Sequence, residues 1–278
     1  MFYLQLRAEL WKLFGKKRTY IGFGMFLLAQ NVIILLFRYT RATRQMVGTL
    51  EGNGYLAQNF ISTLTIATIM IVVLAYTLLP LYVALVGGDL VAKEAEDGTL
   101  RMILSRPVSR VRLLALKWLA GLLFSIVLVV ALGLFGLLFT SFWFPWGGLF
   151  AFIPGELFSL FDPGAGLARY AGAHFFMVTK ACTIMSLAFM FSCFNVKPAA
   201  ATILALSLIM INGILQEIPF FHDYEHWFLT YHLNIWREMF AANIPWPRLG
   251  QSLSLLLGLN LTFVIVGCTA FQVRDIKS

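Results

Sequence analysis

Charge is scarce in this sequence of 278 residues, because Asp, Glu, Lys and Arg together make up only 12% of it. An ordinary soluble domain has about twice that share. With 60% hydrophobic residues, the composition excludes a disordered chain, which needs low hydrophobicity and high charge. It also leaves too little polar side chain to cover a soluble globule. Three cysteines are too few for a disulfide scaffold. Much of this chain is therefore expected to have lipid as its solvent.

Six stretches are long and apolar enough to cross a bilayer as helices, which needs roughly 20 residues each. They are about 19–37, 60–86, 111–140, 172–194, 198–215 and 252–271. Segment 141–160 is apolar too, but Pro145 and Pro154 interrupt it, and Phe142, Trp143, Phe144 and Trp146 are typical of an aromatic belt. A seventh, broken span there is the alternative. The sequence thus predicts an all-α membrane protein, with residues 1–278 forming one transmembrane domain.

Basic residues predict the orientation of these spans. If the N-terminus is cytoplasmic, the inner side carries 14 basic and 6 acidic residues, and the outer side carries 6 basic and 7 acidic residues. We therefore expect both termini in the cytoplasm of a multi-pass protein of the cell membrane, typically the bacterial inner membrane. No small-residue cleavage site follows the first apolar run, so that run is predicted to be a retained anchor. The net charge of +8 then reflects topology and contact with anionic lipids, and it gives no support to nucleic-acid binding.

Two segments outside the spans carry helix signals. Residues 2–14 place Phe2, Leu6, Leu10 and Leu13 at helical spacing, which favours an interfacial helix over the start of one long first helix. The inner loop 87–112 is predicted to hold two short helices. In the first, Leu90, Val91 and Ala95 form one face, while Lys93, Glu94, Glu96 and Asp97 mostly face water.

Residues that start and stop helices recur within that loop. Gly98 suits the left-handed stop after the first short helix, and Thr99 is predicted to cap the second. Pro107 disfavours helix at Arg106, and Ser109 is predicted to cap the third span. A plain solvated loop is the simpler interpretation, but four helix signals in about a dozen residues argue against it.

The run KEAEDGTLRMILSRPVSRVRLLALKWLAG (93–121) resembles the membrane-spanning subunits of ABC-2 type ABC transporters. The resemblance lies in an acidic pair, Gly-Thr-Leu and then Ser-x-Pro-Val-Ser-Arg after the second span, with Lys117 later. It implies six spans and a coupling helix around 87–100 that docks into a partner ATPase. The residues that it assigns to coupling are Glu94, Glu96, Asp97, Gly98, Thr99, Leu100, Arg106, Pro107, Ser109 and Arg110. Arg101 departs from the acidic residue common in relatives.

No G-x-x-x-x-G-K-[ST] phosphate loop occurs in the sequence, so ATP and Mg²⁺ are expected on another chain. The resemblance implies two copies of an ABC ATPase and a second permease, either another copy of this chain or a homologue. It favours an exporter that is itself no enzyme, with an unidentified substrate. The sequence does not distinguish an exporter from a membrane component of a sensing or immunity complex.

Two further features suggest chemistry. His222, Glu225 and His226 match the H-x-x-E-H zinc signature, and His232 and Glu238 could complete a site. This is the basis of the alternative function, a polytopic membrane metalloenzyme, although an amphipathic outer segment explains the same residues. Metal delivery is a third interpretation of the motif. Lys180 lies inside the fourth span, where it either faces a translocation path and an anionic cargo group or extends outward to water.

Overall fold

The computed structural model describes residues 2–104, 109–153 and 157–273. Within these residues, five helices are long and apolar enough to span a membrane. These are α2 (Lys17–Tyr39), α7 (Arg110–Ser141), α8 (Pro163–Cys193), α9 (Pro198–Gln216) and α11 (Trp246–Val273). A sixth span results if α4 (Thr63–Tyr76) and α5 (Leu78–Glu96), which are bent by 46°, are taken together. Each of the six predicted spans falls on one of these elements.

The bend between α4 and α5 has a cause in the sequence. Pro80 lies in the first turn of α5, so the carbonyl with which its ring would clash in a continuous helix is that of Tyr76, the last residue of α4. Thr77, between the two helices, has φ −108° and ψ −84°, which is outside the helical region. Pro80 therefore breaks the second span near its middle, whereas the sequence placed this proline near the end of a shorter span.

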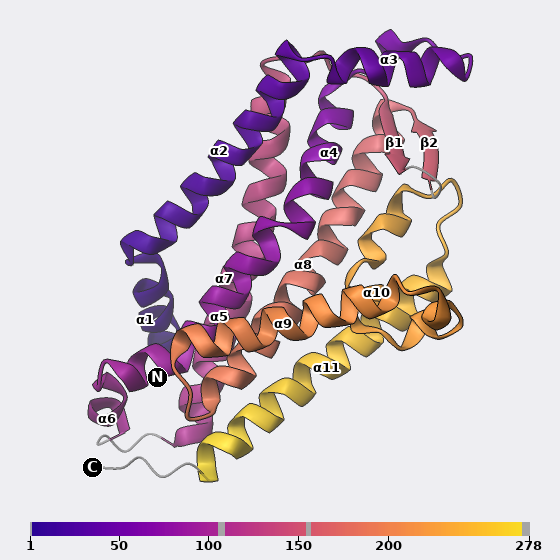
Figure 1. Ribbon diagram of the computed structural model, residues 1–278. Coiled ribbons are helices and arrows are strands. Elements are labelled where there is room, and N and C mark those ends of the chain that lie inside the picture. Colours follow the sequence, from indigo (N-terminus) through magenta and orange to yellow (C-terminus); the bar gives the residue numbers. More distant parts are fainter. Residues whose placement is uncertain (1, 105–108, 154–156, 274–278) are drawn as a thin grey trace.

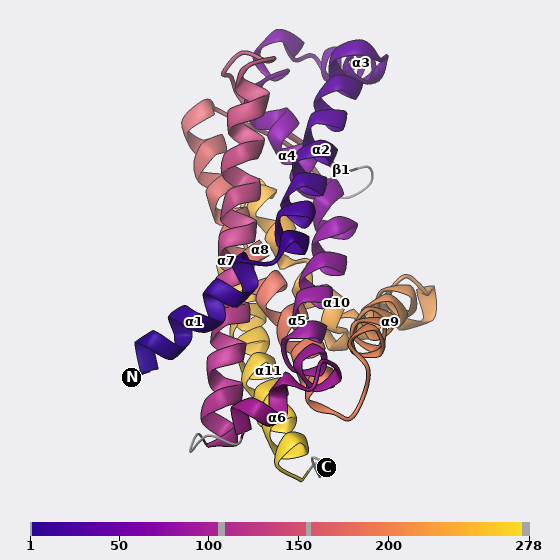
Figure 2. The same ribbon diagram turned by 90° about the vertical axis from the view of Figure 1, so that its left-hand side faces the viewer.

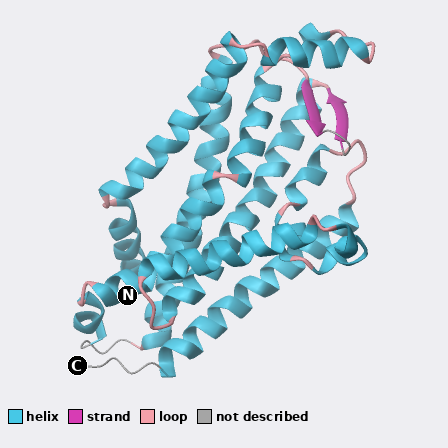
Figure 3. Ribbon diagram, in the orientation of Figure 1, coloured by secondary structure: helices cyan, strands magenta, loops and turns pink. Residues whose placement is uncertain are grey.

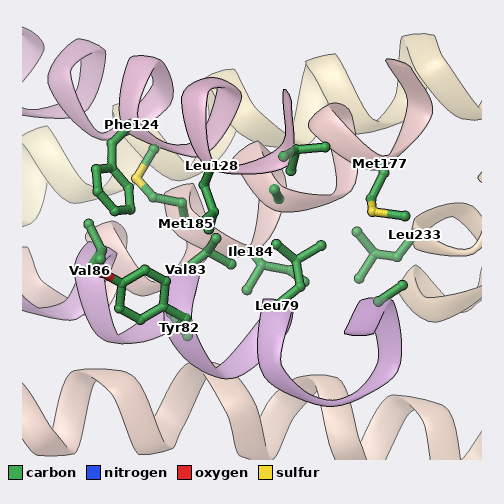
Figure 4. Close-up of a cluster of buried hydrophobic side chains, with 14 of the residues drawn as sticks. Leu79, Tyr82, Val83, Val86, Phe124, Leu128, Met177, Ile184, Met185 and Leu233 are labelled. Atoms are coloured by element: carbon green, nitrogen blue, oxygen red, sulfur yellow. The ribbon is translucent and has the colours of Figure 1, made fainter. Parts of the chain in front are cut away.

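The core lies where α5, α7 and α8 pack together. Figure 4 shows Leu79, Tyr82 and Val83 of α5 facing Phe124 and Leu128 of α7, beside Ile184 and Met185 of α8. Glycine permits this close approach. A Cβ on Gly87 would lie 2.4 Å from the carbonyl oxygen of Met185, and one on Gly88 would lie 2.5 Å from Thr202 Oγ1 of α9.

A buried polar network also joins the helices. Asn260 of α11 donates to Thr183 Oγ1 of α8 at 2.7 Å and accepts from Ser186 Oγ at 2.6 Å. Trp118 of α7 donates to the same serine at 2.8 Å. Such interhelical bonds stabilise membrane bundles by about 0.6 kcal/mol each on average. The network ties α7, α8 and α11 together.

The helix α1 (Phe2–Phe14) and the last turns of α11 lie at one end of the bundle, as does α6 (Thr99–Leu104), whereas α3 (Ala42–Gly52) lies at the other end (Figures 1 and 2). The helix α1 is separate from α2, with a break at Gly15 and Lys16. This arrangement agrees with a separate N-terminal helix. Helix α9 crosses in front of α8 at a steep angle in Figure 1.

Two strands between α7 and α8 are a feature that the sequence did not predict. The strands β1 (Leu149–Ile153) and β2 (Leu157–Phe161) pair antiparallel, with Leu149 opposite Phe161 (Figure 3). The alternative of a broken seventh span is therefore wrong for these strand residues, whereas the aromatic belt at Phe142, Trp143, Phe144 and Trp146 stays a prediction. Side chains at the start of α4 hold the hairpin, because Ser62 Oγ donates to the Gly148 carbonyl at 2.6 Å and Phe150 N donates to Thr65 Oγ1 at 2.9 Å.

The connection between α9 and α11 folds back against α8. It contains the 3₁₀ helix η2 (Pro219–Trp227), the short α10 (Leu229–Leu233) and the 3₁₀ helix η3 (Ile235–Phe240). Trp236, Met239 and Phe240 of η3 are buried in the main core. Arg169, near the start of α8, donates to the carbonyls of Met239 and Ala241 at 3.2 Å and anchors this segment. A further 3₁₀ turn, η1 (Ala57–Asn59), precedes α4.

Candidate functional site

The loop predicted after the second span is largely a continuation of that span. Residues 87–96, expected to start a separate short helix, are the last turns of α5. The prediction of two short helices is therefore wrong for the first of them. The predicted span ends at residue 86, but Gly87 and Gly88 continue α5 and allow close helix packing, as described above. The distinct short helix is α6, which begins at Thr99.

Gly98 makes the turn between α5 and α6, as predicted. Its φ is +73°, a left-handed conformation that side chains other than glycine adopt at a cost. Thr99 is the first residue of α6, and its hydroxyl donates to the Glu94 carbonyl at 3.3 Å. The Thr99 side chain therefore bonds to the end of α5, whereas the sequence predicted that it would cap α6. Leu100 is buried in the main core, so α6 is attached to the bundle.

The start of α7 follows the prediction at Ser109, whose side chain accepts from Arg112 N at 3.3 Å. Arg110 Nη1 donates to the Gln272 carbonyl at 3.2 Å and so connects α7 to the end of α11. Arg106 and Pro107, which the resemblance also assigned to coupling, lie outside the described residues.

A cluster of four charged side chains joins α1, α5 and α7 at this end of the molecule, and we call it the charged junction (Glu9, Lys12, Glu94 and Lys117). Lys117 Nζ lies 2.6 Å from Glu94 Oε1 and 3.0 Å from Glu9 Oε2. Lys12 Nζ lies 2.7 Å from Glu9 Oε1 and 3.4 Å from Glu94 Oε1. Since Lys117 is 1% exposed and Glu94 17%, the predicted solvent-facing position of Glu94 is wrong.

The charges of the junction stabilise each other. Burial raises the pKa of Glu9, but Lys117 and Lys12 lower it by more, so the net pKa lies below its ordinary value. Burial lowers the pKa of Lys12, but hydrogen bonding and attraction to Glu9, with help from Glu94, raise it above its ordinary value. Both groups are therefore held in their charged forms, and α1 is fixed to α5 and α7.

A second ion pair joins α2 to α5. Arg18 at the start of α2 pairs with Asp89 of α5. Tyr82 of α5 donates its hydroxyl proton to the Thr19 carbonyl at 3.0 Å. The first turn of α2 is thereby attached to α5, so four helices meet where α5 ends.

The remaining acidic residues of the predicted site face outward. Glu96 and Asp97 are exposed, and both pair with Lys93, at 2.8 Å and 3.1 Å. Surface pairs of this kind contribute little to stability. These two carboxylates are therefore available to an incoming partner at little cost.

Lys180 lies away from this end, within α8. Its side chain is buried, and Nζ donates to Asn234 Oδ1 at 2.8 Å, beside η3. The ammonium also lies 4.8 Å from the ring centroid of Tyr76, the residue at the α4–α5 bend. The side chain thus points into the protein and does not extend outward to water. Its predicted role in a translocation path stays a prediction.

The zinc-like motif does not have the expected geometry. His222, Glu225 and His226 lie in η2, a 3₁₀ helix, where residues four apart point about 120° away from each other. His232 uses both ring nitrogens elsewhere, one at 2.9 Å from Ser252 Oγ and the other at 2.9 Å from the His226 carbonyl. In the parts of the chain that the structure describes, no three His, Cys, Asp or Glu side chains come together as a metal site would need.

Sequence reasoning missed the partners in the charged junction. In the sequence, Glu9 is only one polar residue of the expected interfacial helix 2–14, and Lys117 is a matched motif position without a role. The available signal was weak: Lys117 is a lysine two turns inside a long apolar run, and such a residue needs a counter-charge. Which carboxylates supply it depends on how α1 folds back, and the sequence does not show that.

A helical bundle with five or six candidate spans and a charged junction at the end of its second span defines a polytopic membrane protein. The family profile described as ABC-2 family transporter protein matches residues 16–222, about three quarters of the chain. The chain therefore belongs to the ABC-2 transporter family, and it is the membrane-spanning permease subunit of an ABC transporter. Subunits of this family are generally not catalytic and work with an ABC ATPase. A search of curated proteins gives no match.

Proposed function

We propose that this chain is the permease of an ATP-driven exporter, and that α6 with the last turn of α5 receives the motion of a separate ATPase. The exposed carboxylates Glu96 and Asp97 would meet the ATPase surface. Both termini and α6 would lie in the cytoplasm, as the distribution of basic residues predicts.

The observation that carries this proposal is the position of Lys117. Its buried ammonium bonds Glu94, three residues before Asp97, and Glu9 of α1 at the same time. A displacement of α6 acts on Glu94 through Gly98 and through the Thr99 hydroxyl. The junction then passes that displacement to α7 and α1, because buried ion pairs resist separation.

The proposed assembly has two ATPase chains, which hold ATP and Mg²⁺, and two permeases, either two copies of this chain or one with a homologue. Closure of the ATPases on ATP would favour one arrangement of the spans over the other, as in a population shift. The α4–α5 bend at Thr77 gives the bundle a point at which the cytoplasmic half of this span can tilt. The membrane lipid surrounds the exposed faces of the spans.

The double variant Glu96→Lys with Asp97→Lys tests the docking surface without disturbing the junction. We expect it to fold and insert, and to lose association with the ATPase or its vanadate-sensitive turnover. The matched control is Glu51→Lys, the same change on α3 at the other end of the molecule, which should leave both intact. Normal association and turnover in the double variant would remove the docking assignment.

A further inference from the structure

A cavity of about 30 Å³ lies beside the charged junction, between α1, α2, α5 and α7. Its polar lining comes from Glu9, Lys12, Lys16, Arg18, Asp89, Glu94 and Lys117. A water molecule needs about 10–15 Å³, so the cavity has room for two waters or for one ammonium group.

Two groups at this cavity have unused bonding capacity. Glu94 Oε2 is buried and has no hydrogen-bond partner among the described residues, although Oε1 of the same carboxylate is occupied. A buried carboxylate oxygen without a donor is costly. The cavity thus presents a carboxylate oxygen that can accept a hydrogen bond from a bound group.

Lys16 presents the opposite need. It lies in the break between α1 and α2, it is exposed, and it forms no ion pair with any residue that the structure describes. Burial of part of the side chain is the largest cause that lowers the pKa of Lys16; Arg18 and Lys117 lower the pKa further, whereas Glu94 and Asp97 raise it. The exposed ammonium of Lys16 can bind an anion.

The cavity lies at the depth of phospholipid headgroups. Lys16 directly precedes the candidate span α2, and Glu94 lies two residues before the end of α5. Beside them, Tyr3, Leu4 and Trp11 of α1 are 72%, 64% and 68% exposed. An amphipathic helix with an apolar face of this kind lies in the membrane interface.

We propose that this cavity binds the headgroup of an amine phospholipid, with its ammonium at Glu94 Oε2 and its phosphate at Lys16. A choline headgroup has no N–H to donate to the carboxylate. A phosphate without an amine would contact Lys16 but would leave Glu94 Oε2 without a donor. The zwitterion matches both groups at once.

The headgroup would then brace the charged junction, because it bonds Glu94 from the side that Lys117 does not reach. This consequence rests on the proposed function, whereas binding of the lipid does not. The test therefore measures lipid binding and the effect of the lipid on coupling in two separate experiments.

The first arm is native mass spectrometry of the purified full chain, titrated with phosphatidylethanolamine, phosphatidylcholine or phosphatidylglycerol of the same acyl chains. We expect about fivefold greater retention of the ethanolamine lipid, the ratio that one hydrogen bond of ordinary net strength gives. Lys16→Ala and the milder Lys16→Gln should lower retention of all three lipids, because their phosphates share that contact, whereas Glu94→Gln should abolish the preference for the ethanolamine lipid. Lys17→Ala, a neighbour that does not line the cavity, is the matched control for Lys16 and should keep both the retention and the preference.

Equal retention of the ethanolamine and choline lipids would overturn the proposal. So would equal retention of phosphatidylglycerol, which would indicate attraction to any phosphate, and so would equal losses from Lys16→Ala and Lys17→Ala. The second arm measures ATP hydrolysis of the complex with its ATPase in nanodiscs of each lipid. Retention in the first arm without a difference in the second would uphold the lipid site and remove only its effect on coupling.

Discussion

Replacing Lys117 with methionine should be among the most damaging single changes at the end of α5. The side chain is 1% exposed and contacts two carboxylates, at 2.6 Å and 3.0 Å. Its loss leaves Glu9 and Glu94 buried and close together, with Lys12 as their remaining partner in the junction. Breaking a buried pair by removing one member typically costs about 3–5 kcal/mol. In the melting temperature, that is a fall of about 6–20 °C.

The reasoning also predicts a rescue. If the damage comes from uncompensated carboxylates, then Lys117→Met combined with Glu9→Gln and Glu94→Gln removes them and restores most of the lost stability. Replacing a buried ion cluster with uncharged groups of similar size often leaves the stability of the protein unchanged or raises it by about 1–4 kcal/mol. Thermal unfolding of the purified chains in one detergent, followed by gel filtration, measures all variants together.

Two results would refute this account of the junction. A single variant as stable as the parent chain would mean that Lys117 carries little of the attachment between the helices. A triple variant no better than the single one would mean that packing of the lysine stem, and not its charge, matters. The rescued triple variant should still be uncoupled from the ATPase, since it lacks the bonds that connect α5 to α1 and α7.

Three further predictions follow from the geometry. Gly98→Ala should cost about 1–2 kcal/mol because φ is +73°, and Gly98→Asn should cost less, as ATPase co-purification and thermal unfolding will show. The contribution of Glu9 to stability is present above its ordinary pKa of 4.5 and is lost as the pH falls through its lowered folded pKa. The contribution of Lys12 is present below its ordinary pKa of 10.5 and is lost as the pH rises through its raised folded pKa. The junction should therefore add no pH dependence to the melting temperature between pH 4.5 and 10.5, which pH scans will measure. Asn260→Leu should cost about 0.6–1.7 kcal/mol in the same unfolding assay, and no change would contradict the role of its network.

Local chemistry could be predicted from the sequence where a single residue decides it. Gly98 is the left-handed stop and Ser109 the cap of α7, because each depends only on its own side chain and its neighbours. The spans could be predicted for the same reason, since apolar length alone identifies them. Asn260 forms a bond to another helix, whereas Asn31 bonds the Leu27 carbonyl of its own helix, and the residue type alone does not distinguish the two.

What could not be predicted depends on which helix faces which. The partner of Glu94 could not be predicted, because Lys117 lies 23 positions later in the sequence and no helical periodicity relates the two residues. Glu94 was therefore expected to face water. Gly87 and Gly88 lie just beyond the predicted span, but they continue α5 at the place where α8 and α9 approach so closely that only glycine fits. The β-hairpin was missed because its pairing is held by Ser62 and Thr65, more than 80 residues away.

The most direct test of the central claim is ATP hydrolysis by the detergent-purified chain, expressed alone and together with its candidate ABC ATPase. The account predicts that the ATPase co-purifies in a stable complex with vanadate-sensitive turnover, and that Glu96→Lys with Asp97→Lys removes it while Glu51→Lys does not. A chain that retains no ATPase, or a complex whose turnover ignores the end of α5, would contradict the account.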